Sequence, residues 1–298
     1  MRPRRSVLYM PGSNNRAIEK ARTLAVDGVI LDLEDGVAPE AKDLARRQVV
    51  AALRDGGFGR REVVVRINGA GSPFTHADLD AVGAARPDAI LIPKVQSPDD
   101  IRRVRESLRG RTGRAPQPLW AMIETPLAIL NIRDIAEAAA DTIAPLTCLV
   151  MGTNDLVKES RMHPGPDRAP LLPWLLTAIA AARAYHIDVL DGVYANLQDP
   201  AGFRAECEQG RMLGMDGKTL VHPNQIETCN AVFSPSAEDI AWARTILEAF
   251  DRPENRGKGA ISVDGRMVEL LHVEIGRRTL AIADAIADAG RQTEPAAG

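Results

Sequence analysis

The 298-residue chain has few cysteines, few aromatic residues and no long apolar run. Its three cysteines, Cys148, Cys207 and Cys229, form no C-x-x-C pair, which argues against a disulfide framework and a structural zinc site. No run of about 18 apolar residues suggests a membrane span, and the basic start MRPRRSVLYMPG lacks the apolar region of a secretory signal. We therefore expect a soluble, unprocessed protein of the reducing cytoplasm.

Neither sign of charge dominates the sequence, because 37 Lys plus Arg against 40 Asp plus Glu give a formal net charge of -3. No basic block indicates a nucleic-acid groove, so we expect neither a nucleic-acid nor a membrane partner. The motifs G-x-S-x-G and H-E-x-x-H are absent, as is a G-x-G-x-x-G after the first predicted strand. Chemistry on a small molecule remains the class that fits best.

Eight short β-branched runs alternate with longer segments rich in Ala, Leu and charged residues. Continuous apolar strands separated by helices indicate parallel pairing, with both faces of the sheet covered. Eight such units within about 230 residues fit a (β/α)8 TIM barrel, which we favour over a doubly wound sheet. The predicted strands are 6–10, 28–33, 62–68, 89–95, 119–124, 148–152, 187–193 and 217–223.

The chain continues beyond the eighth predicted strand with a helix, a Gly-rich link, a hairpin and a closing helix. The Asp-Gly pair in VDGR, between two short alternating runs, predicts the hairpin. This extension is too small to fold alone, so it must pack on its own barrel or on a neighbouring one. The predicted segments are the helix 236–250, the link 251–260, the hairpin 261–269 and the helix 270–288, which divide the chain into 1–250 and 251–298.

Polar residues follow the apolar runs at the carboxyl ends of six predicted strands, where barrel enzymes carry their active sites. Glu124 and Asp155 follow adjacent strands, so their carboxylates can converge on one hard cation. Two carboxylates with waters and substrate oxygens suit Mg²⁺, although either residue alone also suits a helix cap. The strand-end residues are Asp32, Glu34, Asp35, Arg66, Asn68, Lys94, Glu124, Asn154, Asp155 and His222.

Two basic positions suggest anion binding. Arg66 follows a buried apolar run, where a guanidinium needs an anionic partner. The partner is either a substrate carboxylate or oxyanion, or an ion pair with Glu34 or Asp35 that would orient Arg66 toward the substrate. Arg16 and Lys20 lie one turn apart at a predicted helix start, where they indicate either a phosphate-bearing ligand or two solvated side chains.

Seven ordered segments match a known family: SVLYMPGSNNRAIEKA, LDLEDGVAPEAKDLAR, VVVRIN, LIPKVQSPDD, MIETPLAILN, MGTNDL and GKTLVHPNQIETCNAVFSPSAEDIAWA. They resemble the citrate lyase β-subunit-like proteins of the wider HpcH/HpaI aldolase group, over about residues 5 to 288. The resemblance implies a (β/α)8 barrel that assembles as a homotrimer or a hexamer.

The resemblance also implies a Mg²⁺-dependent carbon-carbon lyase. Its substrate would be a 3-hydroxy-carboxyacyl thioester of the malyl-, citramalyl- or citryl-CoA type, cleaved to an acyl thioester and a 2-oxo acid. Three alternatives stay open: a thioesterase on the same substrates, a class II pyruvate aldolase, and a non-catalytic thioester-binding subunit.

Individual roles follow from the same resemblance. Glu124 and Asp155 match the Mg²⁺ ligands, and Arg66 matches the arginine that grips the substrate. The backbone N–H groups of the MGTND turn are implied to hold a substrate carboxylate, and the PGSNNR helix start to hold the thioester carrier. The implied substrate-binding residues are Arg16, Lys20, Arg66, Glu124, Gly152, Thr153 and Asn154.

The C-terminal extension departs from the family pattern. Members that act on CoA esters usually read D-G-k-M-I-D-x-P-H, and the second Asp reaches a neighbour's site as acid or base. Here that position is Glu269, and Leu271 replaces the proline. Because a shift of about 1 Å costs about 100-fold in a positioned proton transfer, Glu269 is an acid/base in a shifted geometry, a selector of a different substrate, or a mark of changed activity.

Overall fold

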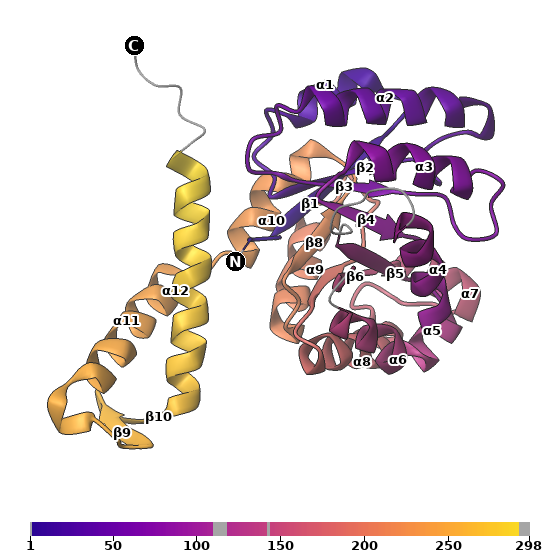
Figure 1. The fold of residues 1–298 in the computed structure, drawn as a ribbon. Coiled ribbons are helices and arrows are strands. Elements are labelled where there is room, and N and C mark those ends of the chain that lie inside the picture. Colours follow the sequence, from indigo (N-terminus) through magenta and orange to yellow (C-terminus); the bar gives the residue numbers. More distant parts are fainter. Residues whose placement is uncertain (1, 110–117, 142–143, 292–298) are drawn as a thin grey trace, which may run out of the picture. The chain divides into compact units, whose positions relative to one another are not determined.

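The computed structural model describes residues 2–109, 118–141 and 144–291. Two compact units are present: the barrel unit, Arg4–Phe233, and the C-terminal unit, residues 2–3 and 234–291 (Figure 1). The helix after the barrel belongs to the C-terminal unit, whereas the predicted division placed it with the barrel in 1–250. How the chain divides into folding domains stays a prediction.

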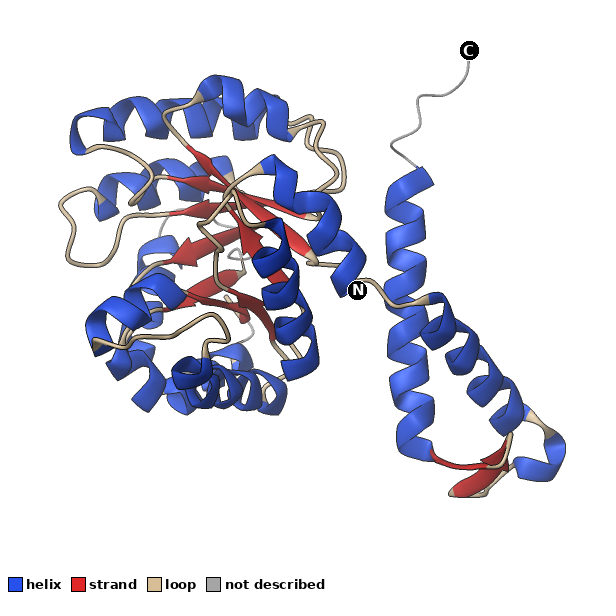
Figure 2. Cartoon of the chain, turned by 180° about the vertical axis from the view of Figure 1, so that it is seen from behind, coloured by secondary structure: helices blue, strands red, loops and turns tan. Residues whose placement is uncertain are grey.

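The barrel unit is a closed sheet of eight parallel strands, each hydrogen-bonded to its neighbours in chain order, with β8 returning to β1 (Figure 2). The predicted (β/α)8 barrel is therefore confirmed. Six strands are shorter than the predicted runs because residues at their carboxyl ends belong to the loops, whereas the first and the sixth strand are each one residue longer than predicted. They are β1 Ser6–Pro11, β2 Gly28–Asp32, β3 Glu62–Arg66, β4 Ala89–Ile92, β5 Leu119–Ile123, β6 Leu146–Met151, β7 Asp188–Asp191 and β8 Gly217–Leu220.

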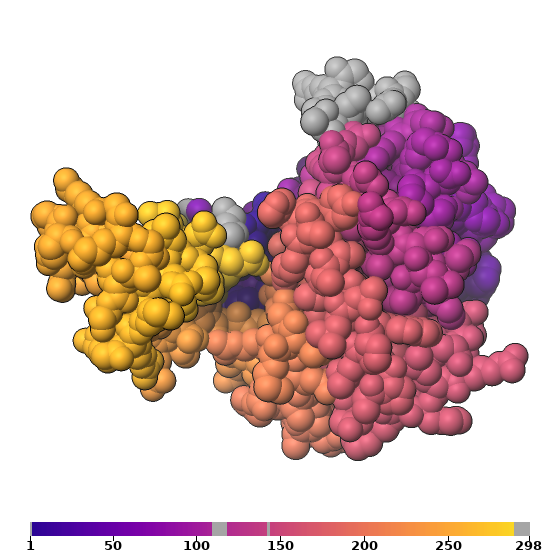
Figure 3. All heavy atoms as spheres, turned by 90° about the horizontal axis from the view of Figure 1, so that it is seen from below, coloured from indigo at the N-terminus to yellow at the C-terminus, as the bar shows by residue number. Residues whose placement is uncertain are grey.

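Helices follow the strands and cover the outside of the barrel. In the space-filling view, successive segments of this unit lie next to one another, as expected when each helix follows its strand around a closed sheet (Figure 3). The helices are α1 Asn15–Ala21, α2 Lys42–Asp55, α3 Thr75–Ala85, α4 Pro98–Arg109, α5 Pro126–Leu130, α6 Ile132–Glu137, α7 Thr153–Ser160, α8 Leu172–Ala184, α9 Pro200–Leu213 and α10 Ile226–Phe233. Short 3-10 turns lie at Pro39–Ala41, Ala138–Ala140, Ala169–Leu171 and Pro223–Gln225.

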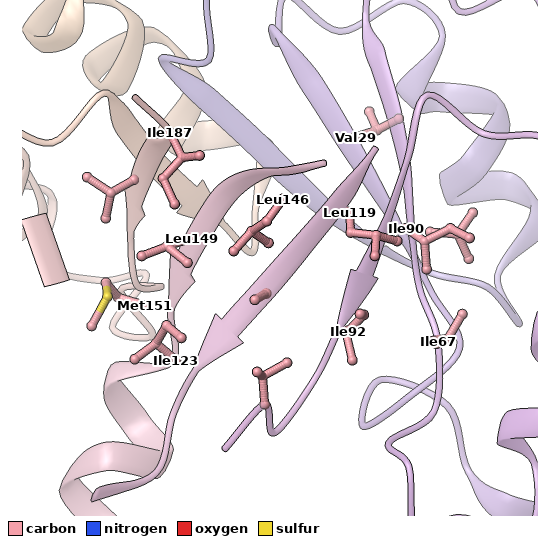
Figure 4. Close-up of a cluster of buried hydrophobic side chains, with 14 of the residues drawn as sticks. Val29, Ile67, Ile90, Ile92, Leu119, Ile123, Leu146, Leu149, Met151 and Ile187 are labelled. Carbon is pink, nitrogen blue, oxygen red and sulfur yellow. The ribbon is translucent and has the colours of Figure 1, made fainter. Parts of the chain in front are cut away.

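Strand side chains alternate between two buried layers, as the period of a β-strand requires. One layer packs against the helices, and Figure 4 shows part of it, including Val29, Ile90, Leu149 and Met151. The other layer consists of strand residues alone and fills the barrel interior. Its members are Val7, Ile30, Val64, Ala89, Leu91, Trp120, Met122, Cys148, Val150 and Leu190.

An ionic cluster closes the amino end of the barrel interior. Arg4 forms ion pairs with Glu62, the first residue of β3, and with Asp188, the first residue of β7, each at 2.7 Å. Its guanidinium lies 4.9 Å from the ring centroid of Trp120. The barrel is therefore plugged at this end, and access to its interior is from the carboxyl ends of the strands.

The C-terminal unit contains α11 Ala237–Asp251, the 3-10 turn Pro253–Asn255, the antiparallel pair β9 Ala260–Val263 and β10 Arg266–Glu269, and α12 Leu270–Arg291. The predicted hairpin and closing helix are confirmed. Asp264 and Gly265 have φ values of 47° and 76°, which an Asp-Gly turn adopts readily. In the described part of the chain, no helix is long and apolar enough to span a membrane.

Candidate active site

Two cavities lie at the carboxyl ends of the barrel strands. The first, which we call the mouth cavity, has a volume of about 320 Å³, and the second has a volume of about 710 Å³ and lies over the loops after β2, β3 and β4. Asp35 lines both cavities. The mouth cavity is lined by Tyr9, Pro11, Asp32, Asp35, Gly36, Arg66, Met122, Met151, Gly152, Thr153, Asn154, Asp155, Val193, Thr219 and Val221.

Arg66 points into the mouth cavity because it ends β3 on the interior face. Its nearest partner is Asp32, which lies opposite it in the β2–β3 register and accepts from Nε at 2.7 Å and from Nη2 at 2.6 Å. Nη1 lies 2.9 Å from Glu34, and the guanidinium lies 4.9 Å from the ring centroid of Tyr9. Although burial opposes the charge, the hydrogen bonds to Asp32 and the field of Glu34 raise the pKa of Arg66 above its ordinary value.

The predicted ion pair between Arg66 and Glu34 is present. Asp35 has a different partner, since its carboxylate lies 3.6 Å from Nζ of Lys94. Asp32, the bidentate partner of Arg66, was not predicted to be one. The signal for it is the alternation of β2: Ile30 fills the barrel interior, so Asp32, two residues later, faces the same way.

Glu124 follows β5 and is buried, with 1% of its surface exposed. Its Oε1 accepts the backbone N–H of Lys94 at 2.6 Å, whereas Oε2 has no hydrogen-bond partner among the described residues. Burial, with smaller contributions from Glu34 and Asp155, raises the pKa of Glu124 to about 7. A buried carboxylate oxygen without a donor is a position that a cation stabilises.

Gly152 provides the space that the Glu124 side chain occupies. A Cβ atom at Gly152 would lie 2.3 Å from Cβ of Glu124 and 2.8 Å from its Oε2, so any larger residue would displace the carboxylate. The N–H of Gly152 donates to the carbonyl of Ile123 at 2.9 Å. In the predicted substrate-binding turn, Gly152 therefore lets the backbone approach Glu124 closely, but its N–H group is already used within the barrel.

Thr153, Asn154 and Asp155 form the first turn of α7 and line the mouth cavity. The first N–H groups of a helix lack an acceptor within it, and the positive end of the helix dipole favours anions. The Asp155 carboxylate is 32% exposed and lies 3.9 Å from Lys158. Gly192 leaves room for Thr153, because a Cβ there would lie against its Oγ1.

The residues at this end of the barrel fit Mg²⁺. Glu124 offers a buried oxygen without a donor among the described residues, Asp155 adds a partly exposed carboxylate, and Gly152 places no side chain in the space beside Oε2. Mg²⁺ is commonly held by one or two carboxylates with waters and substrate oxygens completing its shell. Among the described residues, no group of three or more His, Cys, Asp or Glu side chains is placed so that it could hold a metal ion.

Three further predicted site residues line neither cavity. Arg16 and Lys20 are exposed on α1 and line neither cavity. Glu269 ends β10 in the C-terminal unit, where its N–H donates to Nδ1 of His272 at 3.0 Å. The roles of all three residues stay predictions.

A buried ionic network that was not predicted from the sequence supports β7 and β8. Lys218 is fully buried and lies 3.0 Å from Asp191 and beside Glu206 of α9, while Arg168 lies 2.8 Å from Asp191. Nζ of Lys218 also donates to the carbonyl of Gly192. A lysine at the second position of a short, fully buried strand is the signal that points to such a network.

The sequence is similar to that of known proteins over most of its length. The model of the HpcH/HpaI aldolase/citrate lyase family matches residues 5–223. The chain is 47% identical over 285 residues to the (3S)-malyl-CoA thioesterase of Cereibacter sphaeroides, covering 96% of each chain. It is 32% identical over 295 residues to the mitochondrial citramalyl-CoA lyase of Homo sapiens, covering 95% of this chain and 86% of the relative.

A solved structure also matches over nearly the whole chain. The protein CitE of Mycobacterium tuberculosis, in complex with magnesium, acetoacetate and coenzyme A, aligns with a TM-score of 0.74 and 27% identity. The alignment covers 95% of this chain and 98% of that one. With the barrel and the strand-end residues described above, these matches show that the chain belongs to the HpcH/HpaI aldolase/citrate lyase family.

Proposed function

We propose that this chain is a Mg²⁺-dependent enzyme that acts on 3-hydroxy-carboxyacyl-CoA thioesters of the malyl type. One observation carries the proposal: Oε2 of Glu124 is buried without a donor among the described residues, beside Gly152 of the cavity that Arg66 and Asp155 line. Magnesium and coenzyme A in the matching CitE structure, and the CoA thioesters named for both relatives, support the cofactor and the substrate class.

Residues that line the mouth cavity or lie beside it divide the work of binding. Glu124 and Asp155 would hold Mg²⁺, which supplies Lewis-acid stabilisation of negative charge on substrate oxygens. The N–H groups of the first turn of α7 hold the terminal carboxylate of the substrate. Arg66, fixed by Asp32 and Glu34, donates to the thioester oxygen as that oxygen gains negative charge.

Hydrolysis of the thioester is the reaction that we propose. The oxygen of a water molecule bonds to the thioester carbonyl carbon, the C–S bond breaks, and the products are a hydroxy diacid and a free CoA thiol. Arg66 would stabilise the oxyanion of the tetrahedral intermediate. The 47% identity to a (3S)-malyl-CoA thioesterase over nearly the full chain favours this reaction.

Carbon-carbon cleavage is the second candidate, favoured by the 32% identity to a citramalyl-CoA lyase. In that reaction the 3-hydroxyl group loses its proton, the bond between C2 and C3 breaks, and the products are a 2-oxo acid and an acyl-CoA enolate, which takes up a proton at carbon. Both reactions place negative charge on the same thioester oxygen, so Arg66 serves either one. Glu269 of a neighbouring subunit is our candidate for the proton donor.

Product analysis separates the two reactions. The enzyme is incubated with (3S)-malyl-CoA and Mg²⁺, and free thiol and glyoxylate are measured in the same samples. We expect thiol and malate in equal amounts without glyoxylate. Formation of glyoxylate while the thioester stays intact would show that the enzyme cleaves the carbon-carbon bond and does not hydrolyse the thioester. No conversion of malyl-, citramalyl- or citryl-CoA would refute the proposed substrate class.

A further inference from the structure

Lys94 has an unusual backbone conformation at the carboxyl end of β4. Its φ angle is 52°, in the left-handed region that side-chain-bearing residues other than Asn and Asp rarely adopt. Such conformations persist where the surrounding structure requires them, and they are concentrated at functional sites. Lys94 lines the 710 Å³ cavity, next to the candidate site.

The backbone of Lys94 holds the proposed metal ligand. Its N–H donates to Oε1 of Glu124 at 2.6 Å, a short and charge-assisted hydrogen bond. With Oε1 occupied in this way, Oε2 is the carboxylate oxygen left without a donor among the described residues. The left-handed turn at Lys94 therefore decides which oxygen of Glu124 is available.

The side chain of Lys94 reaches the substrate arginine through a second carboxylate. Nζ donates to Oε1 of Glu34, and the other oxygen of that carboxylate lies 2.9 Å from Nη1 of Arg66. Glu34 is buried, whereas the Lys94 side chain is 46% exposed at the rim of the second cavity. The ammonium group of Lys94 therefore neutralises the negative charge of a buried carboxylate. Lys94, Glu34 and Arg66 form a continuous ionic chain.

We propose that Lys94 is a positioning residue that sets Glu124 and Arg66 relative to each other. Its backbone fixes the Mg²⁺ ligand, and its ammonium fixes Glu34 and thereby the guanidinium of Arg66. This role rests on the proposed function, because it needs Glu124 to hold the metal and Arg66 to hold the thioester.

Two substitutions separate the backbone role from the side-chain role. Lys94→Asn removes the ammonium but tolerates the left-handed conformation, so the bond to Glu124 is kept. Lys94→Val also removes the ammonium, and its β-branched side chain disfavours that conformation. Lys94→Arg keeps a cation for Glu34. Mn²⁺ affinity without substrate is measured by electron paramagnetic resonance, and KM and kcat for malyl-CoA are measured separately.

For Lys94→Asn we expect Mn²⁺ affinity within about twofold of wild type and kcat/KM lowered by about tenfold or more. Lys94→Val should in addition lose about tenfold in Mn²⁺ affinity, and Lys94→Arg should recover most of the kcat/KM. Arg86→Asn is the matched control, since Arg86 is also left-handed, with φ of 57°, but precedes β4 at the opposite end of the barrel. It should change neither quantity.

Wild-type kinetic constants in Lys94→Asn would overturn the side-chain role, and equal Mn²⁺ affinity in Lys94→Val and Lys94→Asn would overturn the backbone role. Thermal unfolding of each variant shows whether the chain is folded. A wild-type protein that binds no Mn²⁺ would instead overturn the proposed function, and the role of Lys94 with it.

Discussion

Glu124 combines burial, a missing donor and proximity to other carboxylates. A carboxylate in such a place is costly when ionised, unless a cation or a proton balances it. In the metal-free chain this cost raises the pKa of Glu124 to about 7, so that a proton neutralises the carboxylate at lower pH. Proton and metal therefore compete for the same group near neutral pH.

The raised pKa of Glu124 predicts a pH-dependent stability. Between its ordinary pKa of 4.5 and about 7, the folded metal-free protein keeps a proton that the unfolded chain has lost. The proton on Glu124 therefore contributes to the free energy of unfolding, by about 3 kcal/mol at most. This stabilisation is fully present below pH 4.5 and is lost as pH rises through about 7. Urea unfolding at about pH 5 and about pH 8 measures it. Glu124→Gln should lose this part of the difference, and an unchanged difference would contradict the assignment.

The lining of the mouth cavity predicts selectivity against a substrate that carries a carboxymethyl group on its hydroxyl-bearing carbon, as citryl-CoA does. Arg66 is the one cationic side chain among the described lining residues, and Asp32 and Glu34 already pair with it. An additional carboxylate would be desolvated without a partner. We expect kcat/KM for citryl-CoA at least about 100-fold below that for malyl-CoA. Comparable values would show that a cation from elsewhere enters the site.

The turn between β6 and α7 brings the site together at the scale of elements. It places Gly152 against Glu124 and directs the first turn of α7 at the mouth cavity. Gly192, after β7, leaves room for Thr153 in the same way. A glycine therefore follows each of the two neighbouring strands β6 and β7, and both glycines allow side chains and backbone to approach closely.

Gly152→Ala should disturb this turn. A Cβ atom 2.3 Å from Cβ of Glu124 forces one of the two segments to move, which we expect to cost about 1–3 kcal/mol in the free energy of unfolding. Mn²⁺ affinity should fall with it. Gly71→Ala is the control, because a Cβ at Gly71 meets no atom within 4 Å. Wild-type Mn²⁺ binding in a folded Gly152→Ala protein would refute the role of this glycine.

Local patterns were sufficient where the signal lies within a few adjacent residues. The Asp264–Gly265 turn is of this kind, and so is the alternation of strands and helices. Pairing across strands was not accessible, because the contact of Asp32 with Arg66 depends on the register of β2 and β3. The left-handed backbone of Lys94 was missed because lysine carries no preference for that conformation.

At the scale of the whole molecule, the C-terminal unit has its own small core but also exposes apolar side chains. Leu270, Leu271 and Ile275 on α12 are each at least half exposed. Which surface covers them depends on the shape of a partner, not on local pattern, so assembly as a homotrimer or hexamer stays a prediction. Glu269 directly precedes α12, and we propose it as a residue that reaches the active site of a neighbouring subunit.

Mixing inactive subunits tests whether Glu269 acts across an interface. If it does, Arg66→Ala and Glu269→Ala proteins combined in equal amounts should recover up to about a quarter of wild-type turnover, because some sites then receive both intact residues. Glu274→Ala, at an exposed position on α12, should be active by itself. Verified mixed oligomers without recovery would count against the shared site.

The magnesium site is tested most directly by titrating Mn²⁺ into wild-type and Glu124→Gln proteins while turnover of (3S)-malyl-CoA is followed in matched samples. Gln keeps the size of Glu but not its charge, so we predict Mn²⁺ affinity weakened at least about 100-fold, with loss of turnover to match. Glu106→Gln, at an exposed position on α4, should behave like wild type. Equal Mn²⁺ affinity in Glu124→Gln and wild type, or turnover that persists in excess chelator, would contradict a metal-dependent reaction at this site.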